Sequence, residues 1–318
     1  MANTVYVLGA GCSRNYSLEY QSTVPRLKSP LDQDFFEIAN TVLAHEHGTK
    51  ERFLPLKNRL KQLFDFDMYN LDPRSRTPGL ENVATILDLE AKQLNNYAII
   101  NLLFDLISIV LWKSLEGPTS NSHKELSDKV KKGDTVISYN YDLLFDNALG
   151  SKLTDGTYRI NFDWVFEGTW SRSAGGPSGI ELLKLHGSLN WLRCEYCGSL
   201  LLYNFKALSR LVLEKLDLAA SSGEFICPKC KRDTLRSVII PPILTKELDD
   251  TEFKYIWSLA SKRLTAAEKI IIIGYSLPPT DFHSEILFRK SRSNRVQSEL
   301  HLDVVNPDNE VVERLTQI

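Results

Sequence analysis

The first strand-like segment of the chain ends in a glycine turn, and this junction constrains the fold more than any other feature. Residues Thr4–Leu8 read Thr-Val-Tyr-Val-Leu, and four of these five are β-branched or aromatic, as is typical of a buried strand. Gly9-Ala10-Gly11 follows at once. Glycines let backbone N–H groups approach a phosphate with no side chain in the way. A strand that ends in such a turn opens the nucleotide site of doubly wound α/β folds, although an ordinary tight turn gives the same pattern.

The composition is that of a globular protein without a strong charge bias. The chain has 318 residues, of which 43% are hydrophobic and 25% charged, enough for one large α/β domain with an insertion. The net charge of -2 gives no support for direct nucleic-acid binding. We expect no signal peptide, and we expect the apolar segment Ile99–Trp112, which contains Asn101 and Asp105, to be too short and too polar to span a bilayer. These features predict a cytoplasmic protein with no membrane partner.

Strand-like and helix-like segments alternate along the rest of the chain. Apolar residues recur at helical spacing over Leu31–Phe66. Over Leu80–Trp112 they exceed one amphipathic stripe, which indicates a core helix or, less favoured, a helix buried against another subunit. This alternation predicts a Rossmann-like α/β fold with a doubly wound parallel sheet, covered by helices on both faces. The other predicted strands are Thr135–Tyr139, Tyr158–Phe166, Ile180–Leu185, Ser237–Ile240, Lys269–Ile273 and Glu299–Val305, and the other helices Thr251–Ala267, Asp281–Ser291 and Asn309–Leu315.

Four of the five cysteines form two CxxC pairs, Cys194 with Cys197 and Cys227 with Cys230. Each pair supplies two thiolates, so together they can close a tetrahedral four-cysteine zinc site. We expect this zinc to be structural, because four thiolates leave no open position for a substrate. Two unrelated turns with reduced cysteines are the alternative. Cys12, which lies in the glycine turn, is not assigned to the metal.

Polar residues follow several predicted strands, where the ligand crevice of an open α/β sheet lies. Asn140-Tyr141-Asp142 could position a water and a ribose, or could simply cap the next helix. His186-Gly187 follows a strand, and an imidazole there can accept a proton at neutral pH, although a lone histidine is more often structural.

Two later strand ends repeat the pattern. Gly274-Tyr275-Ser276 forms a second glycine turn that could meet a phosphate, with Asp281 expected as the N-cap of the following helix. Asn306 follows the last strand and could hold an adenosine ribose. We expect the remaining histidines to lie at the surface or in caps; they are His45, His47, His123, His283 and His301.

Taken in order, these motifs resemble those of the sirtuin family over nearly the whole chain. Gly9–Ser13 is similar to the family's GAG-x-S loop, Asn140-Tyr141-Asp142 to its Asn-x-Asp element and His186-Gly187 to its catalytic His-Gly. The four-cysteine zinc module then follows, as it does in sirtuins. Gly274-Tyr275-Ser276 and Asn306 are similar to the family's later cofactor contacts.

Several segments depart from the protein-deacylating sirtuins. Those enzymes continue after GAG-x-S with Gly-Ile-Pro-Asp-Phe-Arg, which is missing after Ser13, and Val238–Pro242 replaces their acyl-lysine-binding segment. The helical insertion, expected at about residues 31–131, is larger than theirs. These departures resemble the sirtuin-like branch of bacterial anti-phage systems. That branch hydrolyses NAD+ outright, often as a homo-oligomer with a partner such as a HerA-type ATPase or an Argonaute.

The resemblance implies one sirtuin-like NAD-binding domain over residues 1–318, with a zinc module at about 192–236. It implies an NAD+ glycohydrolase with NAD+ as substrate and structural Zn2+. Asn140 and Asp142 would hold a water and the ribose or carboxamide, and His186 would act as general base. The pyrophosphate would lie on Gly9–Ser13. An NAD-dependent protein deacylase and a non-catalytic NAD+ or ADP-ribose sensor are the alternatives, and Asn15–Pro30 is the candidate gate. Leu80–Trp112 is the candidate oligomer interface.

Overall fold

A computed structural model describes most of the chain. The described residues are 3–16, 27–45, 49–71, 77–115, 117–154, 156–166, 169–172, 179–203, 226–232, 235–240, 250–278, 281–295 and 299–317. Most of the candidate gate, residues 17–26, and the proline pair Pro241-Pro242 lie outside the described residues.

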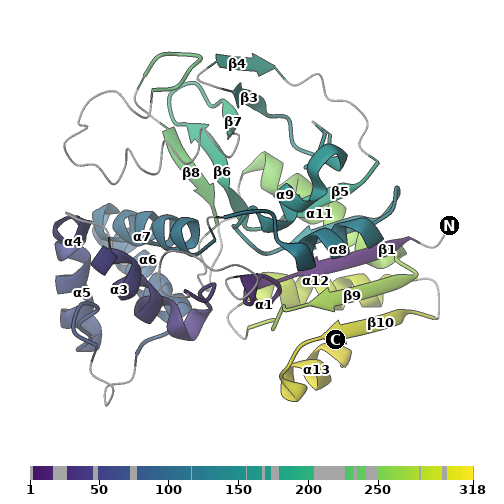
Figure 1. The fold of residues 1–318 in the computed structure, drawn as a ribbon, viewed down its shortest axis with the longest axis horizontal. Helices are drawn as coiled ribbons and strands as arrows, with labels where there is room; N and C mark the ends of the chain where they lie inside the picture. The colour runs from purple at the N-terminus through teal and green to yellow at the C-terminus, as the bar shows by residue number, and fades with distance from the viewer. Residues whose placement is uncertain are drawn as a thin grey trace.

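A five-stranded, wholly parallel sheet forms the centre of the molecule, in the order β10-β9-β1-β2-β5 (Figure 1). Val5 of β1 pairs with Thr135 on one side and with Ile270 on the other, which places the first strand in the middle. The parallel sheet predicted from the alternating pattern is confirmed. Its strands are β1 (Thr4–Leu8), β2 (Thr135–Ser138), β5 (Glu181–Lys184), β9 (Lys269–Ile273) and β10 (His301–Val305).

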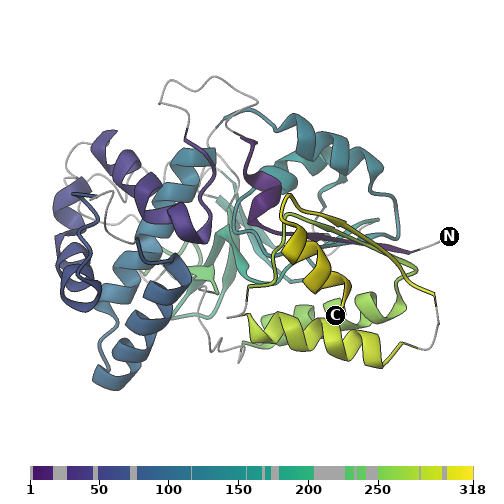
Figure 2. The same cartoon turned by 90° about the horizontal axis from the view of Figure 1, so that it is seen from below.

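Helices cover both faces of this sheet, as a doubly wound fold requires (Figure 2). On one face lie α8 (Asn121–Lys129) and α9 (Leu144–Leu149), and on the other α11 (Thr251–Ala266) and α12 (Phe282–Ser293). The last helix, α13 (Asn309–Thr316), packs against β10. The single-turn helix α1 (Ala10–Ser13) begins directly after β1.

A second five-stranded sheet, in the order β4-β3-β7-β6-β8, lies beyond the end of β5 (Figure 1). Its side chains alternate between two cores: Leu200 and Leu202 pack with the parallel sheet, whereas Leu201 and Tyr203 pack with the helices described next. The strand expected over Tyr158–Phe166 begins only at Asp163, because turns and bends precede it, with Arg159 at a φ of +60°. The strands are β3 (Asp163–Phe166), β4 (Thr169–Arg172), β6 (Gly187–Cys194), β7 (Leu200–Tyr203) and β8 (Leu235–Ile239).

A group of helices with its own hydrophobic core lies beside the second sheet. The expected helical segment Leu80–Trp112 consists of two helices, because Asn95 adopts a φ of +49° and ends α6. The boundaries of the expected insertion stay a prediction. The elements are η1 (Asp32–Asp34), α3 (Phe35–His45), α4 (Thr49–Arg52), α5 (Leu54–Phe64), α6 (Leu80–Leu94) and α7 (Ala98–Leu115).

Among the described residues, α7 is the one helix that is long and apolar enough to cross a membrane. It has 18 residues and a mean hydropathy of 1.8, so our expectation that this segment is too short and too polar was wrong. In the structure 56% of it is buried, and Leu103, Leu106 and Val110 are buried in the helical core. This burial explains its apolar composition without a bilayer, in agreement with the favoured interpretation of a core helix.

Candidate functional site

The strand order of the parallel sheet predicts where a ligand would bind. From β1 the chain adds β2 and β5 on one side, and then returns to add β9 and β10 on the other. The order therefore reverses between β1 and β9. In open α/β sheets, ligands bind at such a switch point, outside the carboxyl ends of the strands. The two glycine turns, Gly9–Gly11 after β1 and Gly274 after β9, meet here.

The two glycine turns pack directly against each other. Gly9 N donates to Ile273 O at 3.1 Å, and Gly11 N donates to Gly274 O at 2.9 Å. Gly274 has a φ of +62°, and a Cβ there would lie 2.1 Å from Cys12 N. These glycines therefore permit a close approach of two strand ends. The N–H groups of Gly9 and Gly11 already bond to the end of β9. A pyrophosphate at this turn would therefore be bound by other groups of the turn.

Asn140 joins the turn after β1 to the loop after β2. Its Nδ2 donates to Gly9 O at 3.0 Å and lies 3.3 Å from Ser13 Oγ, and that hydroxyl donates to Asp142 Oδ2 at 2.8 Å. Asn140 and Asp142 are both buried. Within the part of the chain that the structure describes, Asn140 Oδ1 is buried and accepts no hydrogen bond. A buried acceptor without a donor costs about 1–3 kcal/mol. This carbonyl is therefore an atom of the site that a ligand hydroxyl or a water would satisfy.

Asp142 also forms an Asx turn just before α9, although the N-cap position of that helix is Leu143, without a side-chain hydrogen bond. Its Oδ1 accepts a hydrogen bond from Leu144 N at 3.0 Å, at the start of α9, while its Oδ2 accepts the one from Ser13. The two contacts use different oxygens, so the Asx turn does not remove Asp142 from the site.

His186 lies just past the end of β5 and faces a carboxylate that the sequence did not assign to it. Its Nε2 lies 3.7 Å from Asp281 Oδ2, and its imidazole is in edge contact with Tyr139, with ring centroids 5.0 Å apart. Asp281 is the N-cap of α12, as predicted, through its Oδ1 and Ser284 N. Its Oδ2 also accepts a hydrogen bond from Tyr275 OH at 2.9 Å. No local sequence signal reveals the contact with His186, because it depends on the chain crossing from β5 to the end of β9.

Two stacked tyrosines lie beside His186 at this end of the sheet. The rings of Tyr139 and Tyr275 are parallel within 4°, with centroids 4.0 Å apart. Burial, reinforced by Asp281, raises the pKa of both phenols above the ordinary value, so both are neutral at physiological pH. His186 is only 8% exposed, and Asn140 and Asp142 are similarly buried. In this conformation the three side chains are therefore largely inaccessible to a dinucleotide, and binding requires the site to open.

Two of the predicted cofactor contacts lie at the same sheet edge without joining this network. Ser276 is exposed. Asn306 Oδ1 accepts a hydrogen bond from Asp308 N at 3.0 Å, within its own turn. Both residues stay predictions as cofactor contacts.

A buried histidine touches the glycine turn: His123 takes part in the N-terminal cap of α8, as one of the two expected alternatives, but it does not lie at the surface. His123 is 2% exposed, with its Nε2 3.6 Å from Cys12 Sγ and its Nδ1 2.9 Å from Ser120 Oγ. It lies in the first turn of α8, whose N-cap is Ser120. Burial, with a contribution from Asp142, raises the pKa of Cys12 to about 12, so its thiol is protonated at neutral pH.

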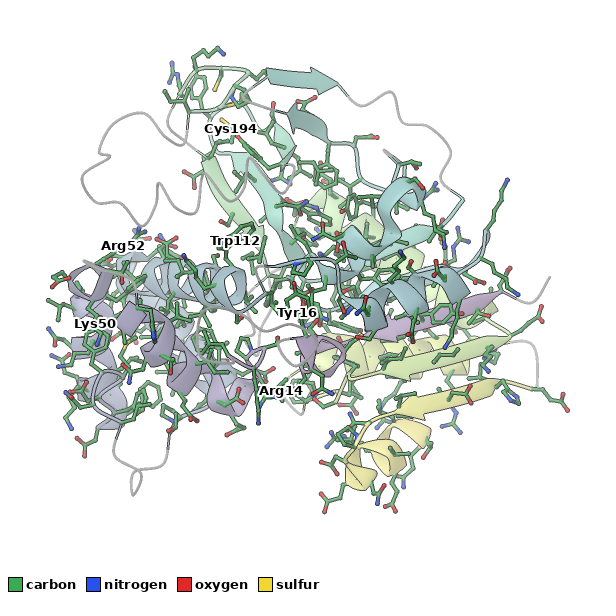
Figure 3. The ribbon with its side chains drawn as sticks, in the orientation of Figure 1. Arg14, Tyr16, Lys50, Arg52, Trp112 and Cys194 are labelled. Atoms are coloured by element: carbon green, nitrogen blue, oxygen red, sulfur yellow. The ribbon has the colours of Figure 1, made fainter. Side chains whose placement is uncertain are left out.

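The four paired cysteines converge as the CxxC spacing predicts. Their sulfur atoms all lie within 4.8 Å of one another, with Cys194 Sγ 3.6 Å from Cys230 Sγ and Cys197 Sγ 3.7 Å from Cys227 Sγ. A tetrahedral site with Zn–S bonds of about 2.3 Å places its sulfurs roughly 3.8 Å apart. The residues therefore fit a zinc ion. In Figure 3, Cys194 lies far from Arg14 and Tyr16, which follow α1, so a metal here would fold the second sheet and take no part at the switch point.

The helical group is tied to the same region. Arg14, immediately after α1, forms an ion pair with Asp34 of η1 and donates to Ser29 O at 2.6 Å. Tyr16 OH donates to Pro118 O at 2.6 Å. The glycine turn is thus fixed on several sides.

Comparisons with known proteins find similarity at the level of structure alone. No protein-family model matches the chain, and no curated protein matches it. A Sir2 enzyme studied for its mechanism and regulation is 13% identical, with a TM-score of 0.43, over 99% of this chain and 91% of that one. A mutant Sir2 homologue in complex with ADP-ribose is 15% identical, with a TM-score of 0.38, over 96% and 80%. Similarity at this level carries neither an activity nor a ligand over to this chain.

Proposed function

We propose that this protein is an NAD+ glycohydrolase, which cleaves the bond between nicotinamide and ribose to give nicotinamide and ADP-ribose. The observation that carries the proposal is the acceptor Asn140 Oδ1, which lies buried beside the switch point of a doubly wound sheet and has no hydrogen-bond donor among the described residues. The identity of the nucleotide comes from the ordered resemblance of the motifs to those of sirtuins.

The proposed reaction needs a water, a base and a site that holds the sugar. The nicotinamide–C1′ bond breaks through an oxocarbenium-like state, the water oxygen bonds to C1′, and nicotinamide leaves as a neutral molecule. Asn140 Oδ1 accepts a hydrogen bond from the water, and His186 takes its proton. Asp281 then stabilises the imidazolium, from 3.7 Å in this structure. Asp142, held by Ser13, orients the ribose or the carboxamide.

Hydrolysis is favoured over deacylation because of two departures in the chain. The segment after Ser13 and the segment Val238–Pro242 both lack the residues of the protein-deacylating sirtuins. An NAD-dependent deacylase would use the same first step with an acyl-lysine oxygen in place of water. A non-catalytic sensor would bind NAD+ or ADP-ribose without turnover.

Replacement of the two central residues tests the assignment. We expect His186→Ala to lower kcat for NAD+ cleavage by roughly 10²–10⁴-fold, the range for general acid–base groups, and Asn140→Ala to lower it by roughly 10²-fold through loss of water positioning. His301→Ala is the matched control, because His301 is an exposed histidine on the edge strand β10. Intact variants of Asn140 and His186 that deplete NAD+ at the wild-type rate would show that the residues are wrongly assigned.

We also propose that the biological effect is NAD+ depletion in the cytoplasm during bacterial anti-phage defence. The resemblance further suggests a homo-oligomer and a partner such as a HerA-type ATPase. Cellular NAD+ should fall after infection in cells that carry the wild-type protein with its genomic neighbour, and should stay constant with His186→Ala. Light scattering on the purified protein, with and without that neighbour, measures the assembly.

A further inference from the structure

Lys184 is a fully buried cation directly behind the candidate site. It is the last residue of β5, two residues before His186, and its side chain is 0% exposed. Burial of an ammonium group is strongly unfavourable unless the charge is paired and hydrogen-bonded. The proposed hydrolysis does not use this side chain, so its burial needs another explanation.

The contacts of Lys184 Nζ are of two kinds. It donates to Asp146 Oδ2 at 3.0 Å, in an ion pair with a carboxylate of α9 that is also buried. It donates to the backbone carbonyl of Asp142 at 2.6 Å. The other oxygen of Asp146 accepts a hydrogen bond from Tyr158 OH at 2.5 Å. Each member of the ion pair thus makes one further hydrogen bond, Lys184 to a backbone carbonyl and Asp146 to a phenol.

The two contacts have different consequences. The contact with Asp146 neutralises the buried charge. The contact with Asp142 O adds a side-chain link between two segments whose regular strand pairing ends with the bond from Leu185 N to Ser138 O. One segment carries Asn140 and Asp142, and the other carries His186. From the far side, Leu189 N donates to Tyr141 O at 3.0 Å, so the loop is held from two directions.

We propose that Lys184 is a positioning residue, which fixes the peptide of Asp142 and so sets the spacing between the Asn140–Asp142 loop and His186. The inference rests on the proposed function, because the spacing matters when a water lies between the two. A displacement of about 1 Å in such a site can cost roughly 10²-fold in rate. Substrate binding depends less on this spacing, so the effect should fall on kcat rather than on KM.

A triple variant separates positioning from charge pairing. In Lys184→Met/Asp146→Leu/Tyr158→Phe all three polar partners are replaced by apolar residues, an exchange that is often close to neutral for stability. It leaves Asp142 O without its side-chain donor. Lys152→Met is the matched control, because Lys152 Nζ also donates to a backbone carbonyl, that of Ser127 at 2.6 Å, away from the sheet's carboxyl edge. The measurements are the melting temperature, kcat and KM for NAD+, and the hydrogen exchange of residues 139–144.

We expect the triple variant to stay folded with a melting temperature lowered only by the loss of the donor to Asp142 O, to lose roughly 10²-fold in kcat with KM changed less than about threefold, and to exchange residues 139–144 at least about tenfold faster. Wild-type kcat and exchange in the folded triple variant would overturn the proposal. If the wild type itself does not cleave NAD+, the proposed function fails, and the exchange rates alone decide the positioning role.

If the triple variant does not fold, a second pair of variants tests the positioning role of Lys184. Lys184→Gln keeps an N–H donor for Asp142 O on a side chain one bond shorter than lysine, whereas Lys184→Met has no donor, and both remove the charge. We expect Lys184→Gln to retain at least about tenfold more kcat than Lys184→Met. Equal kcat values in the two variants would overturn the positioning role.

Discussion

His186 Nε2 lies 3.7 Å from Asp281 Oδ2, and this pair brings together residues that follow strands on opposite sides of β1. The carboxylate is itself held by Tyr275 OH and by Ser284 N. A carboxylate fixed in this way keeps a histidine in one orientation and stabilises its protonated form. The side chain of Asp281 therefore both caps α12 and contacts the proposed base, His186.

Asp281→Asn tests the role of the negative charge. Asparagine is as good an N-cap as aspartate, so α12 should keep its start. The imidazolium loses its counter-charge, and we expect kcat for NAD+ cleavage to fall by about 10²-fold with the melting temperature nearly unchanged. Steady-state kinetics and thermal unfolding measure both quantities.

Asp308→Asn is the control for this variant. Asp308 is the N-cap of α13 and accepts a hydrogen bond from Glu310 N, but it is exposed. We expect it to leave kcat unchanged. A loss of equal size in both variants would mean that capping, rather than charge beside His186, explains the effect.

The zinc site predicts a fixed metal content. The purified protein should contain one zinc per chain by metal analysis, since four thiolates at these distances complete one tetrahedral ion. Cys227→Ser, at a buried ligand, should lose the metal and lower the melting temperature, whereas Cys12→Ser should retain it. Metal-free protein with an unchanged melting temperature would support two unrelated turns instead.

The thiol of Cys12 should be unreactive in the folded protein. Its pKa is raised to about 12, mainly by burial, against about 8.5 in an unfolded chain. At pH 8.5 the thiolate fraction is roughly 10³-fold smaller in the folded state, so alkylation by iodoacetamide should be slowed to that degree. Because the Cys12 thiol ionises at a higher pH in the folded than in the unfolded state, its contribution to the free energy of unfolding is fully present below pH about 8.5. That contribution is lost as the pH rises toward 12. Peptide mass spectrometry of labelled native and urea-unfolded protein tests this, and equal labelling rates would contradict it.

Gly274→Ala should lower the free energy of unfolding by more than backbone strain alone would. A Cβ at this position would lie 2.1 Å from Cys12 N, in addition to the positive φ of +62°. Gly133 also has a positive φ, of +95°, with nothing within 4 Å, so Gly133→Ala measures the strain alone. We expect Gly274→Ala to lose about 1–3 kcal/mol more in the free energy of unfolding, as over-packing does. Equal losses in urea titrations would show that the two turns do not need to touch.

The parallel sheet could be predicted from the sequence because its strands are short, apolar and bounded by turn residues. Thr135–Tyr139 and Lys269–Ile273 are such segments, and both are strands within a residue of their predicted ends. The cysteine cluster was equally local, since CxxC spacing fixes its geometry. The gathering of Asn140, Asp142 and His186 at one edge followed from strand polarity alone.

The parts that could not be predicted depend on contacts between distant segments. Asp281 faces His186, and His123 contacts Cys12, only because strands far apart in sequence become neighbours. The second sheet was missed because β6 follows β5 after only two residues, so the chain gives no loop signal between them. Lys184 reads as an ordinary charged residue at a strand end until its burial is known.

The measurement that tests the central claim most directly is product analysis of NAD+ incubated with the purified protein. It should be run alone, with the protein encoded by the neighbouring gene, and with an acylated peptide. We predict equal amounts of nicotinamide and free ADP-ribose without any acyl acceptor. Nicotinamide release only in the presence of the acylated peptide would contradict hydrolysis and identify a deacylase. Saturable NAD+ binding without turnover under all three conditions would contradict an enzyme and identify a sensor.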